Sequence, residues 1–229
     1  MTMTDLEAQK EQAALHALEH IQSGMTLGLG TGSTAKYFVQ GLGRKLEAGA
    51  LQDISAVPTS EATAQMARDL NIPLQDLFAS GVDIAIDGMD EVTDALDAIK
   101  GLGGALAREK VVAARAKQFI LIGDETKRVN HLGEKAPVPV EVLPFGWRAA
   151  QRDLGALGCN VVLREKEGEV VRSDNGNVLL DCHFSEPFDA LKVALSISVI
   201  PGVLEHGLFL GLAKRAFVAT SEGVTELNL

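Results

Sequence analysis

The sequence predicts an α/β protein built on a parallel sheet with helices on both faces, with a smaller α+β domain inserted into it. Up to residue 122, short apolar runs alternate with segments of helical period, which is the order that builds a parallel sheet. From residue 138 the order becomes β-α-β-β-α-β, the ferredoxin-like split unit. A chain of 229 residues has room for a large domain with a subdomain.

The elements of the first half follow from apolar periodicity and from the turn residues between them. We expect helices over residues 5–22, 35–46, 59–70 and 105–116. We expect strands over residues 25–30, 54–57, 72–77, 82–86 and 119–122, the one at 72–77 being a short edge strand. Gly24 can end the first helix, and Ser33 or Thr34 can cap the second.

The second half contains the inserted domain and a returning tail. Its strands are expected at residues 138–142, 160–164, 178–184 and near 208–210, and its helices at 145–157 and 188–198. Asn175-Gly176 is a strong hairpin signal. Residues 216–228 alternate around a Ser-Glu-Gly turn and should return to the first domain. The larger domain is therefore predicted to comprise residues 1–132 plus 207–229, and the smaller one residues 133–206.

Composition limits the range of partners and compartments. The formal net charge of −10 argues against nucleic acid and anionic membrane surfaces as partners. The polar, acidic N-terminus does not resemble a signal peptide, and no apolar run approaches the roughly 18 residues that span a bilayer. Cys159 and Cys182 are the two cysteines, expected on strands as small buried residues in a reducing cytoplasm.

The segment GLGTGSTA, residues 28–35, predicts a phosphate site. Its glycines let backbone N–H groups approach an anion, and the following helix offers its N-terminus. The dinucleotide fingerprint fails because Ser33 stands where a third glycine is needed, and Lys36 lacks the spacing of a P-loop lysine. A tight strand–helix turn without a ligand is the alternative.

Three acids and a lysine in the segment from Asp83 to Val112, which begins in a predicted buried strand, are candidate catalytic residues. Asp87 and Asp90 are three residues apart, Lys100 precedes a glycine-rich turn, and Glu109 follows on a helix. Carboxylates can move protons, and a lysine can stabilise an oxyanion. Two alternatives remain: Asp87 and Asp90 hold a divalent metal, or they cap a turn while Glu109 is an exposed residue paired to Arg108 or Lys110.

Other polar residues are weaker candidates. Lys127 follows a predicted strand and could clamp a phosphate, although a lone lysine, like Lys10, is more often solvated. His16 and His20 are four residues apart on a helix, but nothing else in the sequence joins them, which favours a solvated face over a metal site.

Four ordered motifs, GLGTGSTA, IDGMDEV, KGLGGALAREK and VPVEVLPFG, closely resemble those of the ribose-5-phosphate isomerase A family. The resemblance covers essentially the whole chain. It implies a cofactor-free cytoplasmic isomerase that interconverts D-ribose 5-phosphate and D-ribulose 5-phosphate in the non-oxidative pentose phosphate pathway. It also implies a Rossmann-like catalytic domain, a ferredoxin-like small domain and a homo-oligomer, either a homodimer or a tetramer.

The resemblance also implies roles for individual residues. Glu109 matches the base that moves the proton between C1 and C2, and Asp87 matches the acid that helps to open the furanose ring. Asp90 and Lys100 match groups that orient the substrate and stabilise the enediolate. The substrate and phosphate contacts would be Thr31, Gly32, Ser33, Thr34, Gly88, Met89, Gly101, Leu102, Gly103, Lys127 and Lys10. Met89 and Leu102 depart from the commoner alanine and glycine.

Two other functions compete with the isomerase. A non-catalytic sugar-phosphate sensor would bind the same ligand but leave the acids without a purpose. A metal-dependent phosphatase or aldolase would use Asp87 and Asp90 as ligands and would lose activity with a chelator.

Overall fold

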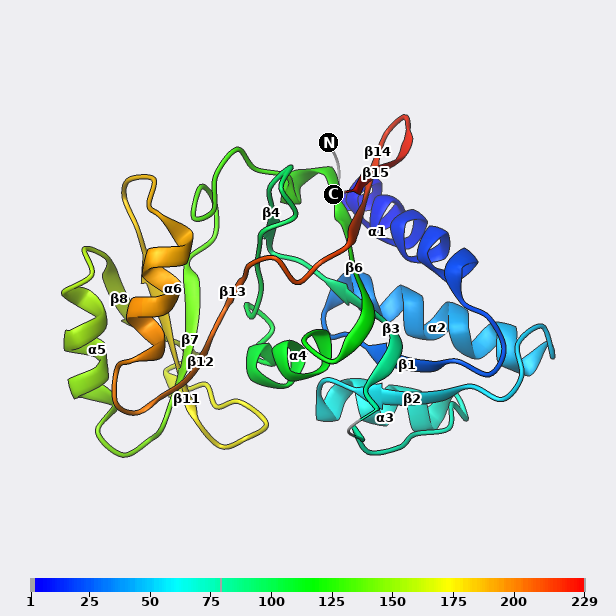
Figure 1. The fold of residues 1–229 in the computed structure, drawn as a ribbon, viewed down its shortest axis with the longest axis horizontal. Coiled ribbons are helices and arrows are strands. Elements are labelled where there is room, and N and C mark those ends of the chain that lie inside the picture. Colours follow the sequence, from blue (N-terminus) through cyan, green and yellow to red (C-terminus); the bar gives the residue numbers. More distant parts are fainter. Residues whose placement is uncertain (1–2, 79, 229) are drawn as a thin grey trace. The chain divides into compact units, whose positions relative to one another are not determined.

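The computed structural model describes residues 3–78 and 80–228 of the chain, which form two compact units (Figure 1). The first unit comprises Met1–Met89, Arg108–Arg128 and Gly211–Leu229, and the second comprises Asp90–Ala107 and Val129–Leu210. Residues 90–107, which the sequence analysis placed in the larger domain, group with the second unit. The domain division at residues 132 and 207 stays a prediction.

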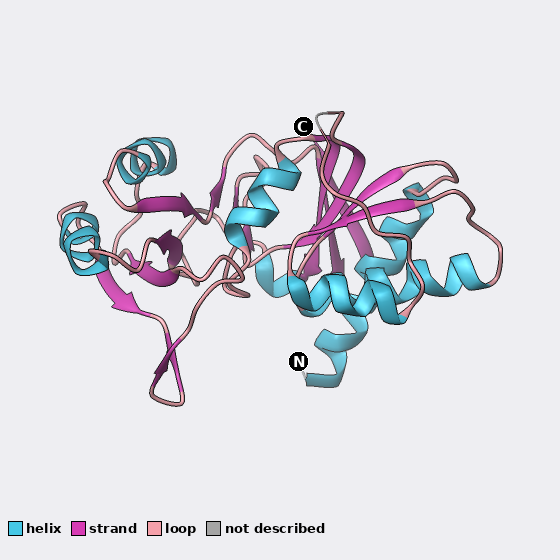
Figure 2. Ribbon diagram, turned by 90° about the horizontal axis from the view of Figure 1, so that it is seen from below, coloured by secondary structure: helices cyan, strands magenta, loops and turns pink. Residues whose placement is uncertain are grey.

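The first unit is organised around a six-stranded sheet of order β15-β14-β6-β3-β1-β2. These strands are β1 (Thr26–Leu29), β2 (Ser55–Pro58), β3 (Val82–Gly88), β6 (Ala116–Asp124), β14 (Arg215–Thr220) and β15 (Gly223–Asn228). The pairs from β14 to β2 are parallel, and β15 returns antiparallel to β14. The returning tail is thereby confirmed, as is the parallel sheet. Figure 2 shows the strands in magenta and the helices in cyan.

Helices cover both faces of this sheet, as the sequence predicts. They are α1 (Met3–Ala17), continued by the short 3-10 helix η1 (Leu18–His20), then α2 (Ser33–Glu47), α3 (Glu61–Asp69) and α4 (Leu106–Ala113). Leu27 and Leu29 share one core cluster with residues of α1 and α2. Gly28 points to the opposite face, because side chains alternate along a strand, and an added Cβ there would lie 2.6 Å from Val112 of α4.

The second unit contains a four-stranded antiparallel sheet of order β12-β7-β11-β8. In chain order its elements are β7 (Val138–Val142), α5 (Trp147–Gly155), β8 (Asn160–Leu163), β11 (Val178–His183), α6 (Ala190–Ser198) and β12 (Val203–His206). This β-α-β-β-α-β order, with the first and last strands adjacent, is the ferredoxin-like arrangement. The alternating Val138, Val140 and Val142 are all buried in its core cluster.

One predicted strand is absent, and another belongs to a different sheet from the one expected. The fourth strand of the split unit is β12, not residues 208–210; Leu208–Phe209 form β13, which joins β5 (Ala98–Ile99) and β4 (Glu91–Val92) in a separate three-stranded sheet. Residues 72–77 form no strand, and Leu74 makes only an isolated bridge to Ala56. Both segments are short and apolar, so periodicity alone does not assign their pairing partners.

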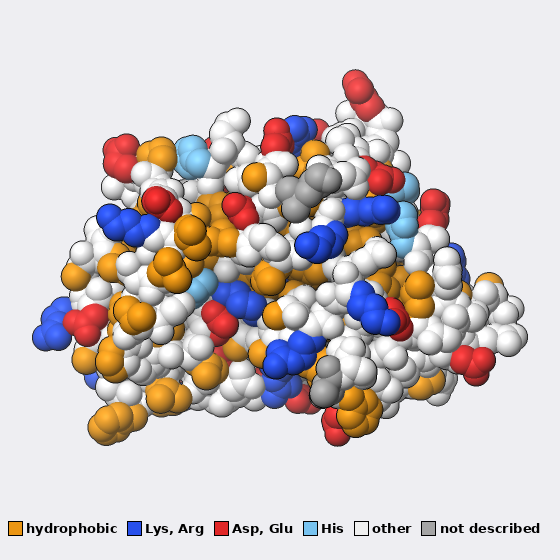
Figure 3. Space-filling model, in the orientation of Figure 1, with side chains coloured by type: hydrophobic (Ala, Val, Ile, Leu, Met, Phe, Trp, Pro, Cys, Tyr) orange, Lys and Arg blue, Asp and Glu red, His pale blue; other side chains and the backbone are white. Residues whose placement is uncertain are grey.

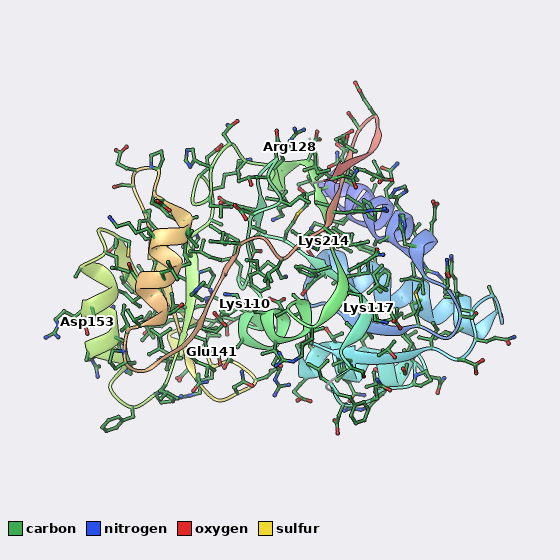
Figure 4. All side chains as sticks on the ribbon, in the orientation of Figure 1. Lys110, Lys117, Arg128, Glu141, Asp153 and Lys214 are labelled. Atoms are coloured by element: carbon green, nitrogen blue, oxygen red, sulfur yellow. The ribbon has the colours of Figure 1, made fainter. Side chains whose placement is uncertain are left out.

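The Asn175-Gly176 turn is present, and a buried carboxylate organises it. Glu141 of β7 accepts hydrogen bonds from Ser173 Oγ at 2.6 Å, Asn175 Nδ2 at 3.0 Å and Asn177 Nδ2 at 2.8 Å (Figure 4). A further hairpin, β9 (Glu165–Lys166) with β10 (Glu169–Val170), precedes this turn and was not predicted.

Smaller corrections concern one helix end and one cysteine. The first helix ends at Ala17 and continues as η1 to His20, so Gly24 does not end it. Cys159 lies just before β8 rather than on a strand, whereas Cys182 lies on β11 and is buried. Within residues 3–78 and 80–228, every helix is too short or too polar to cross a membrane.

Candidate active site

Asp87 lies at the carboxyl end of β3, where open parallel sheets bind their ligands, and is buried. Its Oδ1 atom accepts hydrogen bonds from the backbone N–H groups of Thr31 at 3.0 Å and Gly88 at 2.7 Å. A Cβ atom at Gly30 would overlap the Asp87 carboxyl group. Gly30 is therefore needed for the β1–α2 loop to pass over this acid, and the predicted glycine segment and acid segment meet here.

The β1–α2 loop presents the N-terminus of α2 at the same edge of the sheet. Gly32 is the N-cap residue with φ of 108°, and no side chain caps the helix, so the expectation that Ser33 or Thr34 caps it is wrong. Ser33 is exposed, whereas Thr34 is buried. The first N–H groups of a helix have no partner within the helix and favour anions, so this terminus can receive a phosphate group.

A cluster of hydroxyl groups holds the loop in place. The Thr31 hydroxyl lies 2.8 Å from that of Thr59, 2.9 Å from that of Ser60 and 3.3 Å from that of Thr63. The Thr63 hydroxyl also donates to the Gly30 carbonyl at 2.9 Å. The sequence analysis missed this support, although Thr59 and Ser60 follow the strand that pairs with β1 and so reach the same edge.

Lys127 lies on the segment that follows β6 at this edge, and Lys10 lies on α1, which is hydrogen-bonded to that segment. Lys127 is on the 3-10 helix η2 (Glu125–Lys127), directly after β6, and is half-buried. Gln9 of α1 donates to the Glu125 carboxylate at 2.9 Å. The neighbouring Lys10 pairs with Glu7 at 2.7 Å, and Glu7 accepts a hydrogen bond from Tyr37 of α2 at 2.7 Å. The loop, Lys10 and Lys127 are thereby tied to one end of the first unit.

Ion pairing lowers the pKa of Glu7 below its usual value. The hydrogen bond from Lys10 is the main cause, followed by the one from the Tyr37 hydroxyl. The anionic form of Glu7 is therefore stabilised, and it joins Lys10 of α1 to Tyr37 of α2.

Glu109 lies in the first turn of α4 and is only 4% exposed. This burial contradicts the alternative in which Glu109 is an exposed helix residue. Arg108, one of its suggested partners, instead pairs with Glu61 at 2.8 Å. A buried carboxylate is screened from water and suits proton transfer better than an exposed one.

In the second unit, Asp90 and Lys100 flank β4 and β5. The Asp90 carboxylate accepts the Leu102 N–H at 2.9 Å, which draws the glycine-rich turn toward it. Lys100 is only 2% exposed, its backbone N–H donates to the Gly207 carbonyl at 2.9 Å, and its Nζ atom lies 5.5 Å from the centre of the Phe209 ring. A lysine that has lost its water shell interacts more strongly with a nearby negative charge.

Arg164 fixes the glycine-rich turn and was missed by the sequence analysis. Its guanidinium donates to the carbonyls of Gly101 at 2.9 Å and Leu102 at 3.0 Å, and it forms a two-pronged ion pair with Asp181. Gly101 has φ of 105°, and an added Cβ there would lie 2.7 Å from Leu106. Gly103 and Leu102, which is 44% exposed, form the open part of the turn.

The fold and these groups are those of a class of protein, the α/β enzymes that act on phosphorylated small molecules. In the first unit, a helix N-terminus can bind an anion and buried carboxylates can accept protons. In the second unit, a buried lysine can stabilise negative charge.

Comparisons with known proteins name the family within that class. The family model described as ribose 5-phosphate isomerase A (phosphoriboisomerase A) matches residues 55–223. The ribose-5-phosphate isomerase A of Deinococcus radiodurans is 48% identical over 224 residues, which are 98% of this chain and 99% of the relative. That of Roseiflexus sp. is 48% identical over 96% of this chain and 95% of the relative. The chain belongs to the ribose-5-phosphate isomerase A family.

Solved structures agree with this assignment. The ribose 5-phosphate isomerase of Plasmodium falciparum superposes with a TM-score of 0.95 at 39% identity, over 98% of this chain and 99% of that one. A D-ribose-5-phosphate isomerase in complex with phospho-erythronic acid superposes with a TM-score of 0.94 at 40% identity, over 98% and 99% of the two chains. The Rossmann-like and ferredoxin-like architecture implied by the sequence motifs is therefore that of the family.

Proposed function

We propose that this chain interconverts D-ribose 5-phosphate and D-ribulose 5-phosphate through an enediolate. The observation that carries the proposal is the match to ribose-5-phosphate isomerase A over almost the full length of both chains, at 48% identity. The bound ligand of a related structure, phospho-erythronic acid, is a phosphorylated acid of sugar-like chemistry and supports a phosphosugar substrate here.

Glu109 is the proton-transferring base of the proposed mechanism. It removes the proton from C2 of the open-chain aldose and returns it to C1, so one carboxylate serves both directions. The C2 proton is too weakly acidic for an unaided carboxylate, so the oxygen that becomes negative must be stabilised. The buried Lys100 and the backbone amides of residues 101–103 supply that stabilisation, and Asp90 orients the substrate.

Asp87 helps to open the furanose ring before this proton transfer. Its Oδ1 atom is engaged by the two backbone N–H groups of Thr31 and Gly88, which holds the carboxyl group in one orientation. Gly88 and Met89 continue the chain beside it and complete the proposed substrate contacts. The substrate phosphate binds at Thr31, Gly32, Ser33 and Thr34, with Lys127 and Lys10 contributing positive charge.

The protein is proposed to act as a cytoplasmic homo-oligomer, a dimer or a tetramer. An apolar stripe on α6 supports self-association: Leu191, Leu195 and Val199 are 62%, 62% and 78% exposed and recur every four residues. Figure 3 shows hydrophobic side chains at the surface over α6.

The decisive experiment is an isomerase assay on D-ribose 5-phosphate, run with and without excess EDTA, with ketose formation as the readout. Turnover that is indifferent to EDTA is the expected result. Turnover lost with EDTA would instead make Asp87 and Asp90 metal ligands. Absent turnover with retained phosphosugar binding would favour a sensor and contradict the proposed activity.

A further inference from the structure

His16 and His20 face a carboxylate that lies 210 residues further along the chain. His16 Nε2 is 2.9 Å from Oε1 of Glu226 on β15, and one ligand atom from each of His16, His20 and Glu226 lies within 4.8 Å of the others. The sequence analysis expected a solvated histidine face with nothing joining it. The C-terminal hairpin supplies the missing third group.

The register of the hairpin explains why these groups meet. Phe217 of β14 pairs directly with Glu226 of β15, so both side chains project from the same face of the hairpin. The buried Phe217 ring stacks on His20, with ring centres 5.1 Å apart, and meets His16 edge-on at 4.8 Å. Packing against one aromatic ring therefore orients both imidazoles beside Glu226.

The geometry points to a metal site: we propose that His16, His20 and Glu226 bind a divalent transition-metal ion of the Zn²⁺ type. Two imidazoles and one carboxylate, with a fourth position open to water, form a ligand set that Zn²⁺ accepts. The site would join η1 at the end of α1 to the C-terminal strand, so the ion would clamp the hairpin onto the helix.

The distances suit such an ion after a small adjustment. Tetrahedral Zn²⁺ with bonds of about 2.0–2.1 Å places two ligand atoms roughly 3.3 Å apart and two imidazole ring centres roughly 5 Å apart. The His16–Glu226 distance is 2.9 Å, and the His16 and His20 ring centres lie 5.9 Å apart. Side-chain shifts of about 1 Å would bring the three ligand atoms and the two ring centres to this spacing.

The surroundings contain one favourable and one opposing charge. The Glu19 carboxylate lies 3.8 Å from His16 Nδ1, beyond hydrogen-bond distance, and its negative charge favours a cation at the site. Arg215 lies close enough to influence both His20 and Glu226, and its positive charge opposes a cation. Figure 3 shows histidine side chains at the surface near the β14–β15 hairpin, with acidic side chains beside them.

Calorimetric titration of Zn²⁺ into the chelator-stripped full chain tests the proposal. We expect one ion per chain, with binding weakened about 10-fold or more by His16→Ala, His20→Ala or Glu226→Gln. Arg215→Gln should tighten binding. His183→Ala is the matched control, because His183 is exposed on β11 and lies in the other unit, and its binding should match that of the unsubstituted chain.

A second readout does not depend on the stability of the histidine variants. Co²⁺ in place of Zn²⁺ should give the visible absorption of a tetrahedral site, and this absorption should be lost in Glu226→Gln, a substitution of nearly equal size at an exposed position. Binding that is absent in the unsubstituted chain, or that persists unchanged in Glu226→Gln, would overturn the site. Isomerase activity should be retained in each of these variants, since none of the substituted residues belongs to the proposed active site.

Discussion

Glu109 sits between Arg108 and Lys110 in the sequence, yet it is 4% exposed and its neighbour Arg108 pairs with Glu61. Burial of this carboxylate comes from the position of α4 on the sheet, where Val112 packs against Gly28. A helix residue with a cation on each side in the sequence is predicted to be exposed. The prediction changes once it is known which face of the helix packs against the sheet. Its proposed role as the base is supported by that burial together with membership of the isomerase family.

Replacing Glu109 by Gln removes the proton acceptor but keeps the size of the side chain. We expect kcat to fall by a factor of roughly 10² or more, the scale of general-base loss, with KM little changed. Steady-state kinetics on D-ribose 5-phosphate measure both constants. Near-normal turnover would show that another group carries the proton.

Gly30→Ala tests the close approach of the β1–α2 loop to Asp87. The new methyl group would overlap the Asp87 carboxyl, so the loop or the acid must move, and we expect kcat/KM to fall at least tenfold because a displacement of about 1 Å can cost far more than that. Gly155→Ala is the control, since an added Cβ at that helical position meets nothing within 4 Å. Equal kinetics for the two variants would contradict the argument.

At the scale of elements, Asp83 links three strands of the first unit. It accepts hydrogen bonds from Lys117 of β6 at 2.7 Å and from the Thr26 N–H of β1 at 2.8 Å (Figure 4 labels Lys117). These bonds, that of Lys117 first, lower the pKa of the Asp83 carboxyl. The Asp83 carboxyl therefore binds a proton less tightly in the folded protein than in the unfolded chain.

The sign of the resulting pH dependence follows from linkage. The stabilisation of the fold by the charged Asp83 carboxylate is fully present above the unfolded pKa of about 3.9. It is lost as the pH falls through the lower pKa of the folded protein. Asp83→Asn should therefore lower the melting temperature at pH 7 and flatten its decline below about pH 4. Thermal melts across this range measure the effect, with Asp53→Asn at an exposed position as control. Parallel pH profiles for Asp83→Asn and the unsubstituted chain would refute the assignment.

The turn after β5 depends on an ion pair between strands of the second unit. Arg164 joins the carbonyls of Gly101 and Leu102 to Asp181. Arg164→Ala should leave Asp181 unpaired and loosen the turn whose amides are proposed to face the substrate, lowering kcat/KM by about tenfold, which corresponds to the loss of a charged hydrogen bond. Arg152→Ala is the control, because the Arg152–Asp153 pair is exposed. An unchanged kcat/KM would show that the turn holds its shape without Arg164.

At the scale of the whole molecule, the apolar stripe on α6 predicts self-association. Leu195→Asp should reduce the mass in solution, measured by size-exclusion chromatography with light scattering, because it places a charge among residues that are expected to be covered by a second copy. Ala62→Asp introduces the same side chain at an exposed position of α3, in the other unit, and should leave the mass unchanged. A monomeric unsubstituted chain, or an unaffected Leu195→Asp variant, would count against a homo-oligomer.

The sequence by itself determined the α/β class, the parallel sheet, the split β-α-β-β-α-β order and the family, because periodicity and the order of motifs are local properties of the chain. Only the tertiary structure decided which short apolar segments pair, so residues 203–206 (β12), and not residues 208–210, form the fourth strand of the split unit. It also brought Thr59, Ser60 and Thr63 to the glycine loop, Arg164 to the glycine turn, and Glu226 to His16. These contacts join residues that are far apart in the sequence. Strand order and register create the contacts, and no local sequence pattern encodes either of them.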